Sequence, residues 1–146
     1  MNSIQEYLTQ SHDKCDELFA MTEERASTSL QSAKEVCAEF IAETERHFQM
    51  EERVMFVAFE NKTGMTQGPT AMMRHEHTQM RTLMQQMQEA LAAENKDKFF
   101  GFSETLMMLI QQHNMKEVQM LYPMAQQHLS EDSQKIVEMM HSMISQ

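Results

Sequence analysis

The stretch TERHFQMEERVM, residues 44–55, places Thr44, His47, Glu51 and Met55 at steps of three or four residues. This spacing keeps the four side chains on one face of an α-helix, the face that a globular protein turns toward its core. A histidine and a glutamate on that face are informative, because an unpaired carboxylate or imidazolium is costly to bury. The stretch therefore predicts a helix whose core face carries a polar site.

Three further segments repeat this pattern. His12 lies on the apolar face of residues 4–19 and His77 on that of residues 73–91. His113 and Glu117 lie on the apolar face of residues 106–124, and Met120 is expected in the core on the same face. Capping and breaking residues place the helices at about residues 3–26, 30–61, 69–93 and 97–122, followed by a short helix over 130–144. We therefore expect an all-α fold, an up-down-up-down four-helix bundle with a short extra C-terminal helix, forming a single domain over residues 1–146.

The ends of these helices are set by a few residues. The expected N-caps are Ser3, Asp97 and Ser130, while Gly64 ends the second helix and Pro69 begins the third. A proline disfavours helical backbone in the residue before it, so the step from Tyr122 to Pro123 predicts a kink or an end of the fourth helix.

Six polar side chains on the predicted core faces form the candidate metal site: His12, His47, Glu51, His77, His113 and Glu117. In neighbouring antiparallel helices, two residues lie at the same depth when their sequence midpoint falls at the connecting turn. The midpoints of His12 with His47, Glu51 with His77, and His77 with His113 fall near residues 29–30, 64 and 95, in the three predicted loops. All six side chains should therefore meet in one layer of the bundle, where such bundles build metal sites.

Composition excludes several classes of partner. The net charge of -10 at pH 7 and the lack of a basic stripe argue against nucleic acid and membrane surfaces as partners. Cys15 and Cys37 are too few for a disulfide framework, and the amino-terminal stretch lacks the pattern of a signal peptide. We expect a cytoplasmic protein.

Four local patterns occur together: His12-Asp13 before Asp16-Glu17-Leu18-Phe19, then His47-Phe48-Gln49-Met50-Glu51-Glu52, then Glu76-His77 with Arg81, and His113 to Glu117 before Leu121-Tyr122-Pro123. With them the chain resembles the hemerythrin-like, or HHE cation-binding, family over nearly its whole length. Four histidines with two glutamates look most like the di-iron domain of iron–sulfur-cluster repair proteins. Oxygen-carrying hemerythrins add a fifth histidine on the third helix, where the candidate positions here hold Met73 and Arg81.

The resemblance implies two iron ions as cofactors. Imidazole with carboxylate suits iron, and the absence of thiolate ligands argues against structural zinc, although ligand type alone leaves manganese and zinc open. Two histidines per metal, two bridging glutamates and a bridging oxo or hydroxo group would give each iron five ligands and leave a sixth position open. An apolar lining that admits small uncharged gases is expected from Phe19, Phe40, Met80, Met84 and Ile110.

Two functions follow as hypotheses. The first is a di-iron protein that binds or reduces O2, peroxide or NO in nitrosative or oxidative stress or in iron–sulfur repair, with a protein electron donor or an iron–sulfur client as partner. Whether it is an enzyme stays open. The alternative is a non-catalytic module that binds O2 or senses oxygen or iron, with a partner surface on the final helix formed by Ile136, Met139, Met140 and Met143. A metal-free structural bundle is the least favoured interpretation.

The remaining polar and aromatic residues are assigned simpler roles. Glu52 lies off the core face and is expected to be a solvated charge. Tyr7 and Tyr122 could lie near the site and donate a hydrogen bond or a radical, but packing is the favoured interpretation. His75, His128 and His141 are expected at the surface or around the site rather than as ligands.

Overall fold

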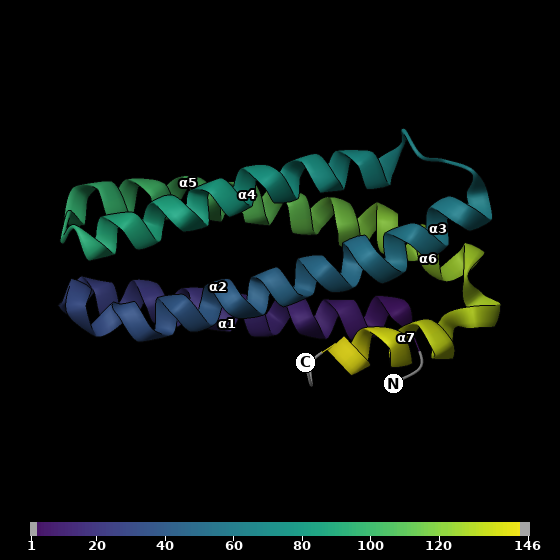
Figure 1. Ribbon diagram of the computed structural model, residues 1–146, viewed down its shortest axis with the longest axis horizontal. Coiled ribbons are helices and arrows are strands. Elements are labelled where there is room, and N and C mark those ends of the chain that lie inside the picture. Colours follow the sequence, from purple (N-terminus) through teal and green to yellow (C-terminus); the bar gives the residue numbers. More distant parts are fainter. Residues whose placement is uncertain (1–2, 144–146) are drawn as a thin grey trace.

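The computed structural model describes residues 3–143, which form helices and no strand. Four long helical segments lie side by side and run in alternating directions, the up-down-up-down arrangement (Figure 1). Their main elements are α1 (Ile4–Thr28), α2 (Leu30–Met50), α4 (Pro69–Ala92) and α5 (Lys96–Lys116). Helix α1 packs on α2, α4 packs on α5, and α2 contacts α4. The predicted all-α four-helix bundle is confirmed.

Local sequence explains most helix ends. The Ser3 hydroxyl accepts a hydrogen bond from the backbone N–H of Glu6 at 3.2 Å and caps α1. Gly64 adopts a left-handed conformation, with φ of 74°, that ends the second segment, and Pro69 begins α4 as expected. The cap of α5 was predicted wrongly: Asn95, not Asp97, accepts the hydrogen bond from the backbone N–H of Lys98.

Two π-helical turns interrupt the second and fourth segments. The turn η1 (Glu51–Met55) joins α2 to α3 (Phe56–Thr63), and η2 (Glu117–Leu121) joins α5 to α6 (Tyr122–His128). The expected kink or end at Pro123 is therefore replaced by a wider turn that lets the helix continue, with the proline in the first turn of α6. Because a π-turn inserts one residue into the helical register, Leu121 and Tyr122 are buried and Met120, expected in the core, is 56 % exposed.

The chain ends with α7 (Ser133–Ser142), which follows a 3-10 turn, η3 (Ser130–Asp132), and packs against α1 and η1. The expected end of this helix, Ile144, lies outside the described residues. Ser130 begins the 3-10 turn and does not cap α7. Ile136 and Met140 are buried and Met143 packs against the same core, so most of the expected partner surface is used within the molecule. Met139 alone of that set is well exposed.

The apolar core is divided by the polar layer. One cluster, which includes Phe56, Phe59 and Met140, lies toward the end of the bundle that α7 covers. The other, which includes Phe40, Met84 and Phe99, lies toward the opposite end. Within residues 3–143, no helix has the length and apolar character needed to cross a bilayer.

Candidate metal centre

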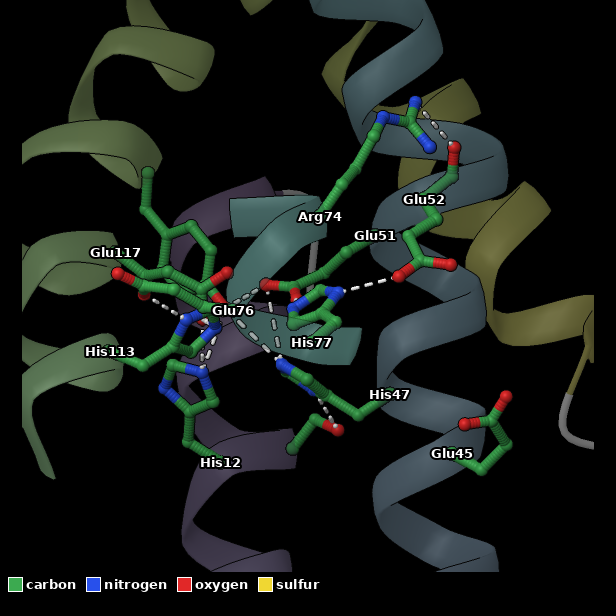
Figure 2. Close-up of polar contacts among 12 residues, drawn as sticks. His12, Glu45, His47, Glu51, Glu52, Arg74, Glu76, His77, His113 and Glu117 are labelled. Carbon is green, nitrogen blue, oxygen red and sulfur yellow. Dashed lines mark hydrogen bonds and ion pairs between the residues drawn. The ribbon is translucent and has the colours of Figure 1, made fainter. Parts of the chain in front are cut away.

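The structure brings all six predicted residues together between the two apolar clusters (Figure 2). His12 lies on α1, His47 in the last turn of α2, His77 on α4 and His113 near the end of α5. Glu51 and Glu117 are the first residues of the two π-turns. Every one of the six side chains is buried, and the two glutamates and His77 are fully buried. The expected common depth is confirmed.

The six residues form two overlapping groups whose ligand atoms lie within 4.8 Å of one another. The first group is His12, His47, Glu51 and Glu117, and the second group is Glu51, His77, His113 and Glu117. Both glutamates belong to both groups. Such sharing is what a carboxylate does when it bridges two cations.

The distances fit this division. In Glu51, Oε2 lies 3.3 Å from Nε2 of His47 and Oε1 lies 3.0 Å from Nε2 of His77, so its two oxygens face different groups. In Glu117, Oε1 lies 2.8 Å from Nε2 of His12 and 3.2 Å from Nε2 of His113. All four histidines therefore turn Nε2 toward the glutamates.

Several atoms at the centre lack a hydrogen-bond partner within residues 3–143. They are Oε1 of Glu51, Oε2 of Glu117, and Nε2 of His77 and of His113, all buried. The close approach of His77 to Glu51 does not have hydrogen-bond geometry. Unpartnered buried polar atoms are rare because each loses its hydration without compensation. Four such atoms in one buried centre, two imidazole nitrogens and two carboxylate oxygens, fit bound cations of the iron, manganese or zinc type.

Hydrogen bonds at Nδ1 hold three of the imidazole rings. Nδ1 of His77 lies 2.7 Å from Oε2 of Glu52, Nδ1 of His113 lies 2.8 Å from Oε1 of Glu76, and Nδ1 of His47 lies 2.7 Å from the Ser11 hydroxyl. A partner at Nδ1 fixes the orientation of a ring and leaves Nε2 free to bind a metal, an arrangement common around metal-binding histidines.

Glu52 is thus not the freely solvated charge that we expected. Burial raises the pKa of the Glu52 carboxyl, but hydrogen bonds from His77 and from Arg81, at 3.0 and 3.2 Å, outweigh burial and lower it. Glu76 behaves alike, because His113 and Lys116, the latter at 2.5 Å, lower its pKa against the effect of burial. Both carboxylates stay ionised and accept the Nδ1 proton of their histidines.

The midpoint rule could have found these partners. The midpoints of Ser11 with His47, of Glu52 with His77 and of Glu76 with His113 fall in the same turns as those of the central residues. The sequence therefore contains this signal, but Ser11, Glu52 and Glu76 lie off the core faces, to which the midpoint rule was restricted. His75, His128 and His141 are exposed, as expected.

In the absence of a metal, the charges of the centre shift the pKa values of its own histidines and glutamates. Burial lowers the pKa of His113, but the charge of Glu117 and the neighbouring carboxylates outweigh it and raise the pKa to about 9. The pKa of His77 is raised in the same way by Glu51 and Glu52. The pKa of Glu51 lies well below its usual range because His47 and other neighbours overcome the effect of burial. A metal would replace these protons and release them on binding.

Tyr122 is the central residue that sequence reasoning underestimated. Its hydroxyl lies 2.5 Å from Oε2 of Glu51, 2.9 Å from Nε2 of His12, 3.1 Å from Oε1 of Glu117 and 3.3 Å from Nε2 of His47. Burial and then the charges of Glu117 and Glu51 raise its pKa well above the usual value. The π-turn η2 brings this ring inward, and no spacing rule for regular α-helices predicts that position.

Comparison with known families agrees with the geometry. The family model described as the hemerythrin HHE cation-binding domain matches residues 3–125. The chain belongs to this family. The match includes all six central residues and Tyr122 and ends before α7, so the hemerythrin HHE assignment rests on the four-helix part of the chain. Neither the curated proteins nor the solved structures give a significant match. Closeness to the iron–sulfur repair branch stays a prediction.

Proposed function

We propose that this hemerythrin HHE domain is a non-haem di-iron protein that binds or reduces O2, peroxide or NO. His12 and His47 would hold one iron, His77 and His113 the other, and Glu51 and Glu117 would bridge them. Support comes from the two overlapping groups, which share both glutamates, and from donor types that suit iron. When bound, the iron pair supplies redox-active positions at which a small ligand can be reduced or held.

The observation that carries the small-ligand proposal is a cavity beside the first group. A chamber of about 20 Å³ contacts His12 and His47 and is walled by apolar side chains that include Phe40, Phe48 and Met80. This volume accommodates about one water-sized molecule. O2, NO and peroxide are of that size, whereas organic substrates are excluded from the chamber.

A larger groove lies next to this chamber. The groove, of about 660 Å³, lies between α1 and the α5–η2 segment, and Asp16, Ile110 and Asn114 line both spaces. Of the expected apolar lining, Phe40, Met80 and Ile110 contact the chamber, Phe19 lines only the groove, and Met84 lines neither. The apolar walls limit water near the histidines, and the three shared residues place the groove next to the chamber.

The residues of the chain have two tasks in this function. Glu52 and Glu76 accept the Nδ1 protons of His77 and His113, so the rings present Nε2 to the centre. The apolar wall of the chamber limits water near the polar side chains of the site. Electrostatic interactions between those side chains are therefore stronger than they would be in water. A role in nitrosative or oxidative stress, or in iron–sulfur repair, is the physiological setting that we propose for this chemistry, on the resemblance alone.

Anaerobic loading with ferrous iron tests the proposal. We expect two iron ions per chain and an optical spectrum that changes on addition of O2, NO or peroxide. Repeated consumption of peroxide or NO indicates an enzyme, and a reversible O2 spectrum indicates a carrier or sensor. The His47→Ala variant should lose iron and the spectral response, while His75→Ala, which alters an exposed histidine on α4, should keep both. Failure of the wild-type protein to bind iron would refute the proposal.

A further inference from the structure

The oxygen of Tyr122 has four polar neighbours, one more than the one donated and two accepted hydrogen bonds of a phenol can satisfy. It lies 2.5 to 3.3 Å from one ligand atom of every member of the first group. A phenol has one proton to donate, so at most one of the two nearby carboxylate oxygens receives a hydrogen bond from it. The ring is fully buried, and its hydroxyl competes with no solvent for this place.

Metal coordination explains the same distances. Ligand atoms about 2.0–2.2 Å from one cation, at right angles to one another, lie about 3 Å apart. The Tyr122 oxygen has this separation from four atoms that themselves form one candidate metal-binding group. It therefore stands where a fifth donor would stand if all five atoms surrounded one ion.

We propose that the phenol oxygen of Tyr122 is a further protein ligand of the metal in the first group. This inference rests on the proposed function and makes the two metal positions chemically different. Coordination exchanges the O–H bond of Tyr122 for an oxygen–metal bond and releases one proton. That proton leaves to solvent. No oxidation or reduction is involved.

The second group provides an internal comparison. Phe56 follows His47 by the same nine residues that separate Tyr122 from His113, and each aromatic residue comes directly after a π-turn. The Phe56 ring stacks on His77 at 5.9 Å, as the Tyr122 ring stacks on His12 at 5.3 Å. The two aromatic residues thus occupy equivalent places, and only Tyr122 carries an oxygen. A phenylalanine in the place of Tyr122 should therefore pack and fold normally.

Resonance Raman spectroscopy of the ferric protein tests the inference directly. A ferric–phenolate bond absorbs visible light by charge transfer, and excitation in that band enhances phenolate vibrations. The chain has only two tyrosines, Tyr7 and Tyr122, so the signal can be assigned with two variants. We expect phenolate vibrations in the wild type and in Tyr7→Phe and their loss in Tyr122→Phe. In an anaerobic ferrous titration, Tyr122→Phe should weaken one of two binding events by about 10–100-fold.

The outcomes separate this inference from the proposed function. Two iron ions per wild-type chain without phenolate vibrations would overturn the inference and leave the di-iron proposal standing. Persistence of the vibrations in Tyr122→Phe, or two unchanged binding events in that variant, would also overturn it. Absence of bound iron in the wild type would overturn both. The wild-type spectrum decides the matter even if a variant folds poorly.

Discussion

The two groups of the metal centre share a backbone plan but differ in their side chains. In each half of the chain a histidine is followed four residues later by a glutamate that begins a π-turn, and an aromatic residue follows that turn. The second group is braced by Glu52 and Glu76, which are held by Arg81 and Lys116. The first group has the Ser11 hydroxyl, the Tyr122 oxygen and the chamber.

This difference indicates a division of labour between the two positions. Carboxylates backed by cations fix the rings of the second group and increase the basicity of their Nε2 atoms. The first group is the one beside which the chamber and the groove lie. We therefore expect metal affinity at the second group to depend on the charged partners of its histidines, and metal affinity at the first group, beside the chamber, to depend on Tyr122.

Removal of a shared carboxylate should have the largest effect. Because Glu51 belongs to both groups, Glu51→Gln should lower the metal content at both positions, from two iron ions per chain to fewer than one. Glu39, exposed on α2, gives the matched control, and Glu39→Gln should bind two. Metal analysis after desalting provides the measurement. A variant that retains one firmly bound iron would show that Glu51 serves a single position.

Removal of the outer partners should separate the two positions. Glu52→Gln keeps the size of the side chain but loses the charge that accepts the Nδ1 proton of His77, so affinity at the second group should fall about 10–100-fold. Ser11→Ala removes a neutral partner of His47 and should have a smaller effect, confined to the first group. Competition with a chromogenic chelator measures both affinities. Equal losses in the two variants would refute the proposed division of labour.

The pH dependence of the metal-free protein should reflect the second group. The pKa of His113 is raised to about 9, above its ordinary value of 6.5, so its contribution to stability is complete below pH 6.5 and disappears as the pH rises through 9. Within that interval each pH unit should cost up to about 1.4 kcal/mol. For a chain of this length this lowers the melting temperature by roughly 3–5 °C per unit.

Calorimetry between pH 6 and 10 checks this expectation. His113→Gln, which cannot carry the charge, should show a flatter profile in the metal-free state. The iron-loaded wild type should also be flatter, because a bound metal replaces the proton. A melting temperature of the metal-free wild type that rises between pH 6.5 and 9 would contradict the assigned charge state.

Sequence spacing was sufficient for the histidines and glutamates but not for the residues after them. His47 and Glu51 are one α-helical turn apart, and the turn lengths set their depth relative to His77, so local periodicity and loop position contain the necessary information. A π-turn depends on which carbonyl accepts each backbone hydrogen bond, and the spacing of apolar residues in the sequence does not predict this. For this reason Met120 was placed in the core, and packing was favoured for Tyr122 over a hydrogen bond to the site.

Single-residue truncation after each π-turn should give the smallest effects and test the remaining difference between the halves. Val54 and Met120 are each seven residues after a central histidine, yet Val54 is 7 % exposed and shares a core cluster with Ile136 and Met140 of α7, whereas Met120 is 56 % exposed. Val54→Ala should lower the free energy of unfolding by about 1–2 kcal/mol through lost burial. Met120→Ala should change it by less than about 0.5 kcal/mol, as exposed sites do. Urea denaturation of the metal-free variants measures both values, and a larger loss in Met120→Ala would mean that the fourth segment keeps the regular α-helical register and that Tyr122 does not reach the first group.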